Sequence, residues 1–248
     1  MTPFTLVLLN HRRRANLARI LDAVAAQSAP PVTFVWNNDP GERFQDGRVA
    51  WAVDSTTNRY CWPRWWMASF AETPLLAVMD DDLCFTDARF FERLSAYMED
   101  AVGDRVVIGP EGGRLGTDAG YYPPTPGPVE VRGVPETHAG PAHFAGPWND
   151  EPVDVVKGRF MALRTRALDG VPARPAYRDV CDDLVISALV ASGRRRAHLV
   201  PSWLGGEFVD LPGKDGAMAL STQPWFRPRR EEAARYYFFN DGVGEERR

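Results

Sequence analysis

Three consecutive aspartates, Asp80, Asp81 and Asp82, directly follow the apolar run of residues 75–79 and carry the strongest chemical signal in the chain. Carboxylates this close repel one another unless a cation or solvent offsets their charge. A hard divalent ion, Mn²⁺ or Mg²⁺, can do so with one or two carboxylates while taking further oxygens from a substrate diphosphate. The pattern therefore predicts a metal site that bridges the protein to a nucleotide-sugar.

The geometry expected of this acidic run follows from extended backbone. Side chains alternate along a strand, so Asp80 and Asp82 should point to the same side and Asp81 away from it. The alternative interpretation is a solvated acidic turn in which Asp82 or Asp87 caps the next helix.

The elements that would position these aspartates are predicted from hydrophobic periodicity. Leu17, Ile20, Leu21 and Val24 recur at the i, i+3, i+4, i+7 spacing of a helix face. Short β-branched or aromatic runs alternate with such helical patterns, which is typical of βαβ units around a mostly parallel sheet. Strands are expected at residues 4–9, 32–36, 49–53, 75–79 and 106–108, and helices at 17–24, 62–70 (with Trp62, Trp65, Trp66 and Phe70 on the buried side) and 87–102. The fold class is α/β.

The second half of the chain begins with a region that differs from the first half in composition and in its lack of regular hydrophobic periodicity. Residues 109–152 are rich in glycine and proline. The aromatic and imidazole rings in this region are candidates for sugar contacts: Tyr121, Tyr122, His138, His143, Phe144 and Trp148. Regular structure is expected again at residues 153–163, in helices at 179–192 and 231–239, and in a strand at 197–200. We therefore divide one domain into residues 1–108, a nucleotide-sugar-binding half, and residues 109–248, an acceptor-binding and catalytic half.

Polar residues also follow other predicted strands. Ligands of open parallel sheets gather at the carboxyl ends of the strands. Asn37 and Asn38 follow residues 32–36, and Asn58 and Arg59 lie in the loop after residues 49–53. Arg12 and Arg14, after the first strand, are placed to reach phosphates.

Composition excludes several broad classes of function. The 248 residues carry a net charge of -4, which gives no basic footprint for nucleic acid. No apolar window is long enough to span a bilayer, and the apolar run at the start is too short for a secretory signal. Three cysteines cannot form a paired disulfide framework, so a cytoplasmic location is expected.

Four motifs in order resemble the exostosin-like glycosyltransferases. They are residues 35–38 (VWNN), 58–59 (NR), 78–82 (VMDDD) and 181–184 (CDDL), followed by a closing segment at residues 225–227 (WFR) and 234–237 (ARYY). The resemblance covers most of the chain. It implies a GT-A fold and a retaining transfer of a hexosyl or N-acetylhexosaminyl group from a nucleotide-sugar donor, expected to be a UDP-sugar, to a glycan or small-molecule acceptor.

The resemblance also implies roles for individual residues on the donor side. Asn38, Asn58 and Arg59 would hold the nucleotide, with Asn37 and Asp81 beside them. Asp80 would hold the ribose and share the metal, and Asp82 would be the principal metal ligand.

A second group of residues would carry the catalytic side. The resemblance places an acidic pair, Asp182 and Asp183, near the acceptor, and Asp183 is favoured. A carboxylate in the first helical turn is stabilised as an anion, although such acids are commonly only caps. Arg227 or Arg229 could neutralise the departing diphosphate. Lys157 and Arg159 stand where the family has small residues near the donor sugar, so the sugar remains open.

Two other enzyme classes and one class of binding protein are the alternatives to this function. A phosphatase-like hydrolase would carry its paired aspartates on the first strand, and a sugar nucleotidyltransferase would need an N-terminal glycine-rich loop with a lysine. A non-catalytic sugar-nucleotide or glycan-binding module is the alternative from another class.

Overall fold

The computed structural model describes residues 3–115, 144–145, 152–213, 220 and 223–239. Its largest sheet has eight strands in the order β3-β2-β1-β4-β11-β6-β12-β9. Their bounds are β1 Phe4–Asn10, β2 Val32–Asn37, β3 Trp51–Asp54, β4 Leu75–Asp80, β6 Val107–Ile108, β9 Pro152–Val153, β11 Phe160–Arg164 and β12 His198–Leu199. The smaller strands are β5 Leu83–Phe85, β7 Gly112–Gly113, β8 Phe144–Ala145, β10 Val155–Val156 and β13 Phe208–Asp210.

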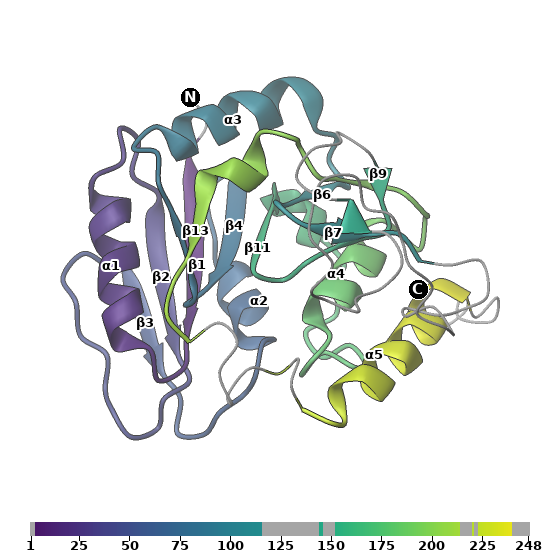
Figure 1. The fold of residues 1–248 in the computed structure, drawn as a ribbon, viewed down its shortest axis with the longest axis horizontal. Coiled ribbons are helices and arrows are strands. Elements are labelled where there is room, and N and C mark those ends of the chain that lie inside the picture. The colour runs from purple at the N-terminus through teal and green to yellow at the C-terminus, as the bar shows by residue number, and fades with distance from the viewer. Residues whose placement is uncertain (1–2, 116–143, 146–151, 214–219, 221–222, 240–248) are drawn as a thin grey trace.

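Helices cover both faces of this sheet (Figure 1). The α-helices are α1 Arg14–Ala25, α2 Pro63–Ala68, α3 Phe90–Ala101, α4 Asp182–Val190 and α5 Phe226–Ala234, and a π-helical turn Arg235–Phe239 continues α5. Short 3-10 turns lie at Thr165–Leu168 and Leu204–Glu207.

The sheet is mostly parallel, as predicted. Strands β1 to β4 pair in parallel, β11 runs antiparallel between β4 and β6, and β12 is again parallel to β6. Because β1 and β4 lie side by side in one direction, the chain that follows each of them emerges at the same edge. That edge carries the three aspartates.

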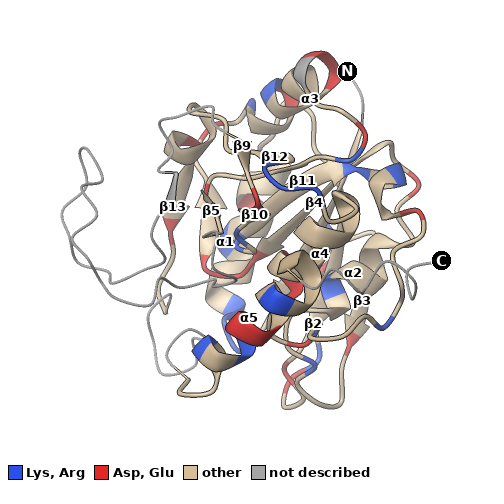
Figure 2. Cartoon of the chain, turned by 90° about the vertical axis from the view of Figure 1, so that its right-hand side faces the viewer, with Lys and Arg blue, Asp and Glu red and all other residues tan. Residues whose placement is uncertain are grey.

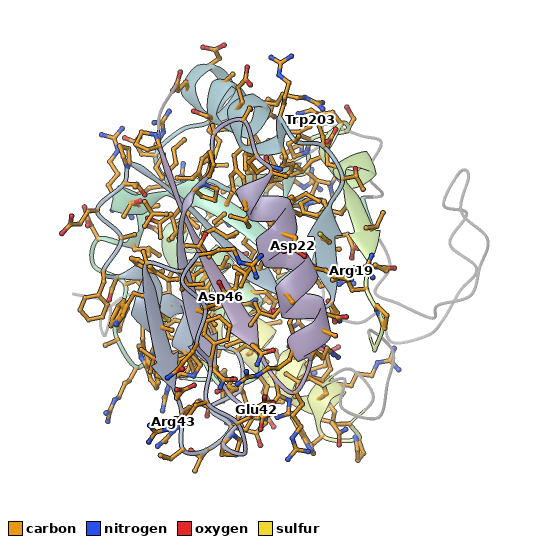
Figure 3. The ribbon with its side chains drawn as sticks, turned by 90° about the vertical axis from the view of Figure 1, so that its left-hand side faces the viewer. Arg19, Asp22, Glu42, Arg43, Asp46 and Trp203 are labelled. Carbon is orange, nitrogen blue, oxygen red and sulfur yellow. The ribbon has the colours of Figure 1, made fainter. Side chains whose placement is uncertain are left out.

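Alternation along β1 and β4 explains why both faces of the sheet are covered. Leu6 and Leu8 pack into a core with α1 and α3, whereas Val7 packs on the other side with α2 and α4. A strand buried on both faces reads as a continuous apolar run, as residues 75–79 do. The outward side of α1 is charged, and Figure 3 shows Arg19 and Asp22 there.

Several predicted boundaries are corrected by the structure. Helix α2 ends at Ala68, so Phe70 lies beyond it and is 62% exposed instead of buried. The last helix begins at Phe226, five residues before the predicted start. Pro228 is compatible with this helix because it stands in the first turn, where backbone N–H groups need no helical partner. Helix α4 begins at Asp182, not at residue 179.

Two further observations concern the chain as a whole. Among the residues with a described structure, none of the helices combines the length and apolarity needed to cross a bilayer. Cys61, Cys84 and Cys181 are all unpaired.

A buried histidine makes the stability of this fold sensitive to acid. The Nδ1 atom of His198 accepts the Val107 N–H at 3.0 Å, so the proton resides on Nε2, 2.7 Å from the Ser187 carbonyl. Burial lowers the pKa of His198 to about 4. The unfolded chain therefore binds one more proton than the folded chain between about pH 6.5 and 4. We expect this histidine to remove roughly 3 kcal/mol of stability as the pH falls through that window.

The measurement is urea unfolding between pH 8 and pH 4 for the wild type and His198→Gln, a residue with no charge to gain. The difference between the two free energies should shrink as the pH falls. Parallel curves would show that His198 does not carry the acid sensitivity.

Candidate functional site

The three aspartates lie where β4 ends. Asp80 is the last residue of the strand, and Asp81 and Asp82 form the turn that leads into β5. The alternation expected of extended backbone therefore stops at Asp80. As a result Asp81 and Asp82, not Asp80 and Asp82, share a partner, because the Arg13 guanidinium lies 2.5 Å from Asp81 and 3.2 Å from Asp82.

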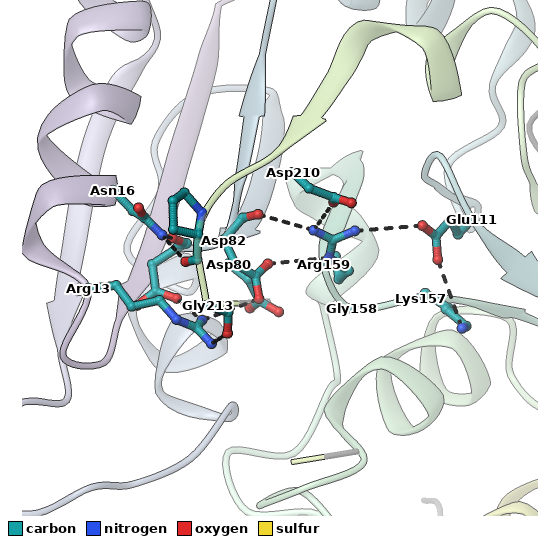
Figure 4. A network of polar contacts seen from close by, with 12 residues as sticks. Arg13, Asn16, Asp80, Asp82, Glu111, Lys157, Gly158, Arg159, Asp210 and Gly213 are labelled. Atoms are coloured by element: carbon teal, nitrogen blue, oxygen red, sulfur yellow. Dashed lines mark hydrogen bonds and ion pairs between the residues drawn. The ribbon is translucent and has the colours of Figure 1, made fainter. Parts of the chain in front are cut away.

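Arginines supply the cations that offset this acidic run. Besides Arg13, Arg159 contacts the Asp82 carboxylate at 3.3 Å and the Asp82 carbonyl at 3.1 Å (Figure 4). Arg159 also reaches Asp210 at 2.6 Å, and Arg13 donates to the Gly213 carbonyl at 2.6 Å. Asp210 and Gly213 are thereby held beside the aspartates.

The pKa values of Asp80 and Asp81 reflect burial more than pairing. Burial raises the pKa of Asp80 to about 7, against the opposing charge of Arg64. Burial likewise raises the pKa of Asp81 to about 6, although Asp81 accepts the His11 N–H at 2.6 Å and pairs with Arg13. Such carboxyl groups favour any further cation that enters the site.

A buried arginine joins the aspartates to helix α4. Arg64, only 1% exposed, lies 2.5 Å from Asp80 and 2.7 Å from Asp182. Asp182 also accepts the indole N–H of Trp65 at 2.7 Å. Burial raises the pKa of Asp182 against the charge of Arg64. Asp182 is therefore enclosed by protein groups, and its predicted place near the acceptor stays a prediction.

The neighbouring acid has a different partner. The two oxygens of Asp183 meet the two terminal nitrogens of Arg230 at 2.7 and 2.9 Å, a bidentate pair that is almost completely buried. Burial alone would raise the pKa of Asp183, but Arg230 outweighs it and holds that pKa below its usual value. Asp183 is consequently an anion fixed in direction, suited to accept a hydrogen bond or to stabilise positive charge.

A glycine, Gly158, makes room for Arg64 and Asp183. A Cβ atom at Gly158 would lie 2.7 Å from the Arg64 guanidinium and 3.2 Å from the Cβ of Asp183. The Gly158 carbonyl also accepts a hydrogen bond from Arg64 at 2.7 Å. The small residue of the Lys157–Gly158–Arg159 stretch therefore packs between Arg64 and Asp183.

The predicted nucleotide contacts sit at the same sheet edge. Asn37 is buried, and its amide donates to the Glu42 carbonyl and to Asp54. Asn38 is also buried: it donates to the Tyr60 carbonyl at 2.7 Å and accepts the Arg59 N–H at 3.0 Å. These amides shape the loops, whereas Arg59 is itself exposed.

That exposed loop also contains Asn58, whose side chain accepts the Tyr60 N–H at 2.8 Å. A direct contact of Asn37, Asn38, Asn58 or Arg59 with a nucleotide stays a prediction.

The arginines predicted from sequence to contact phosphates lie toward the surface of the protein. Arg14 pairs with Glu42 at 3.2 Å, and Arg12 is exposed. Arg227 and Arg229 lie on the exposed side of α5, where Arg229 packs 4.6 Å from the Tyr177 ring centre and pairs with Glu232. Figure 2 shows that basic and acidic residues alternate in short groups along α5.

Sequence reasoning missed Arg13, Arg64 and Arg230, although two of them carry a readable signal. Arg230 shares the i, i+3, i+4, i+7 face of the buried residues Ala233, Ala234 and Tyr237, which distinguishes it from Arg227 and Arg229. Arg64 is the one charge in the apolar helix α2, and a buried cation requires a carboxylate partner.

The donor atoms at the end of β4 fit a divalent ion. Asp80 is 29% exposed, and the contacts of Asp82 to arginine are long, at 3.2 and 3.3 Å, so both carboxylates retain lone pairs. No group of three or more metal-ligating side chains occurs in the part of the chain that the structure describes. An ion held here would take its remaining oxygens from a diphosphate and water, as Mg²⁺ and Mn²⁺ commonly do.

Most of the aromatic residues predicted as sugar contacts, at positions 121–148, lie outside the described residues, and the side chain of Phe144 is also not described.

Comparison with solved structures identifies the fold. Neither a protein-family model nor a curated protein sequence matches the chain. The mannosyltransferase PcManGT from Pyrobaculum calidifontis, in complex with GDP-Man and Mn²⁺, aligns over 95% of this chain and 70% of its own, with 13% identity and a TM-score of 0.54. S. aureus TarS aligns over 79% of this chain with 15% identity and a TM-score of 0.50. The chain has a GT-A-type fold.

A second TarS structure, residues 1–349 in complex with UDP-GlcNAc, aligns over 81% of this chain with 15% identity and a TM-score of 0.50. The matched region is 34% of TarS and 56% of its 1–349 fragment. At this identity the likeness establishes the fold, and it excludes the phosphatase-like fold considered from sequence.

Proposed function

We propose that this chain is a glycosyltransferase that moves a sugar from a nucleotide-sugar donor to an acceptor hydroxyl with the help of Mn²⁺ or Mg²⁺. The observation that carries the proposal is one sheet edge of a GT-A-type fold on which two acidic groups meet across Arg64. On one side are Asp80 to Asp82, and on the other Asp182 and Asp183. The mannosyltransferase complex with GDP-Man and Mn²⁺ and the TarS complex with UDP-GlcNAc support this class of donor.

The donor side is built mainly from residues 1–108 in this proposal, with Arg159 added from the second half. Asp82 and Asp80 would hold the ion, which when bound supplies positive charge to the departing diphosphate. Arg13 and Arg159 already lie against Asp82, so their guanidinium groups are the nearest cations for the phosphate oxygens. We assign the phosphate-facing role to these two in preference to Arg227 and Arg229.

The acceptor side is built mainly from residues 109–248, with Asp183 at its centre. The anion held by Arg230 would accept a hydrogen bond from the acceptor hydroxyl and stabilise positive charge that develops on the sugar ring. Its lowered pKa makes Asp183 a weak base, which favours electrostatic stabilisation over complete proton removal. The finer assignment, an exostosin-like retaining enzyme using a UDP-hexose or UDP-N-acetylhexosamine, rests on the motif resemblance.

The test is a panel of UDP- and GDP-sugars with Mn²⁺, in which nucleoside diphosphate release is measured with and without a chelator. We expect metal-dependent release with at least one donor, and a loss of about a hundredfold or more in Asp82→Ala because a metal ligand is removed. Asp87→Ala is the matched control, since Asp87 is an acid on the same segment that pairs with Arg93 away from the site.

Two outcomes would contradict the proposal. Nucleotide-sugar binding without turnover on any acceptor would favour the non-catalytic module. Release that is indifferent to the metal and to Asp82→Ala would remove the metal role.

A further inference from the structure

A cavity of about 300 Å³ opens beside the proposed site, lined by Tyr60, Tyr177, Asp179, Val180, Trp225 and Arg229. We call it the aromatic pocket. Its walls come from the loop after β3, the segment before α4, and the first turn of α5 with the residue that precedes it. Three segments distant in sequence therefore converge on it. Ligand pockets of this size are commonly lined by rings with a few placed polar groups.

Two rings of the pocket are unusually open to solvent. Tyr60 is 40% exposed and Trp225 is 41% exposed. Their centroids lie 6.4 Å apart with planes at 82°, so the two rings present faces in different directions. Large exposed rings next to each other mark binding surfaces more often than solitary ones do. A pyranose ring offers an apolar C–H face to such a surface.

The polar groups of the pocket suit a neutral, hydroxyl-bearing ligand. Asp179 and Arg229 supply one negative and one positive charge, with side chains 60% and 51% exposed. The carboxylate accepts hydrogen bonds from hydroxyl groups and the guanidinium donates to them. Because the two charges balance, the pocket does not select for an anion such as a diphosphate.

The walls of the pocket are tied to the residues of the proposed site. The Tyr60 carbonyl accepts the Asn38 amide at 2.7 Å, and the Cys61 N–H donates to the Asp179 carbonyl at 3.2 Å. Asp179 precedes the first residue of α4 by three positions, and α5, which follows Trp225, carries the Arg230 that holds Asp183. A ligand in the pocket therefore lies beside the start of α4, where Asp183 is fixed.

We propose that the aromatic pocket binds a neutral pyranose of the acceptor, stacked on Trp225 and Tyr60 and hydrogen-bonded by Asp179 and Arg229. This assignment rests on the proposed function, since it names the acceptor class of the same site. A nucleobase is the competing occupant, because the loop with Asn58 and Arg59 was predicted to hold the nucleotide. The balanced pair of charged groups and the start of α4 favour the sugar.

The experiment compares wild type with Trp225→Ala, using methyl and p-nitrophenyl pyranosides of the gluco, galacto, manno and N-acetylgluco series as probes. Binding of each probe is followed by saturation-transfer NMR, and acceptor KM by transfer from the donor. We expect at least one neutral pyranoside to bind the wild type and its KM to rise by about tenfold or more in Trp225→Ala. Affinity for UDP or GDP, measured by calorimetry, should change by less than about twofold.

The matched control is Trp51→Ala. Trp51 is 37% exposed on the edge strand β3, so this substitution removes a comparable exposed ring away from the pocket. Neither the acceptor KM nor the nucleotide affinity should change. A loss of nucleotide affinity in Trp225→Ala would assign the pocket to the base and overturn the proposal. Unchanged constants, or no binding of any pyranoside by the wild type, would overturn it too. Pyranoside binding in a protein that binds no nucleotide-sugar would instead contradict the proposed function alone.

Discussion

Replacing Asp183 by asparagine is expected to lower sugar transfer by about a thousandfold while leaving nucleotide affinity close to that of the wild type. The substitution keeps the shape of the side chain and removes only its charge. In the structure this charge is held by two hydrogen bonds from Arg230 and lies at the start of α4, next to Asp182, which Arg64 joins to Asp80. An interaction needed mainly in the transition state lowers kcat without lowering donor affinity.

The substitution also leaves Arg230 buried beside an uncharged group, which lowers stability independently of catalysis. A double variant, Asp183→Asn with Arg230→Met, separates the two effects because it removes the unpaired cation as well. We expect the double variant to regain melting temperature and to remain inactive. Recovery of transfer along with stability would show that Asp183 is only a structural partner of Arg230.

Replacing Arg64 by methionine is expected to destabilise the fold by about 3–5 kcal/mol. Methionine fills much of the same space but leaves Asp182, 2% exposed, without its cation and Asp80 without its nearest one. Removing one partner of a buried pair is costly because the other charge stays buried and uncompensated. For a chain of this length the loss corresponds to a fall in melting temperature of roughly 6–20 °C.

Two comparison variants make this measurement specific to the buried network. Arg48→Met removes an arginine that pairs with Asp22 and Asp46 at the surface, where ion pairs contribute about 0–1 kcal/mol. Adding Asp182→Asn to Arg64→Met should restore a large part of the loss, because no uncompensated charge then remains on α4. Equal stability of Arg64→Met and wild type would show that solvent, not Arg64, compensates the two carboxyl groups.

Local patterns explain why the main elements could be predicted. Residues 75–79 and residues 4–9 are apolar on both faces because β1 and β4 lie between two helical layers. The face formed by Leu17, Ile20, Leu21 and Val24 is buried in α1 as its spacing requires. Together with the motif order, these patterns led to the GT-A-type fold that the solved structures confirm, whereas the exostosin-like assignment remains a prediction.

Boundaries were predicted less well where a tight turn or a proline intervenes. Phe70 matched the buried spacing of a helix, but α2 contains only 6 residues and ends before it. The last helix was predicted from residue 231, but α5 begins at Phe226, and Pro228 is accommodated in its first turn. Periodicity describes the interior of an element and says little about the residues that end it.

By itself, the sequence determined that three carboxylates stand at the end of a buried strand and that a second acidic pair begins a later helix. It also required that some cation offset the first group. Only the tertiary structure decided which cations these are: Arg13, Arg64 and Arg159 stand up to 77 residues away in sequence from the aspartates of this run that they contact. Charge pairing depends on distance in space, and no local pattern encodes which of 29 basic residues will fold against which carboxylate.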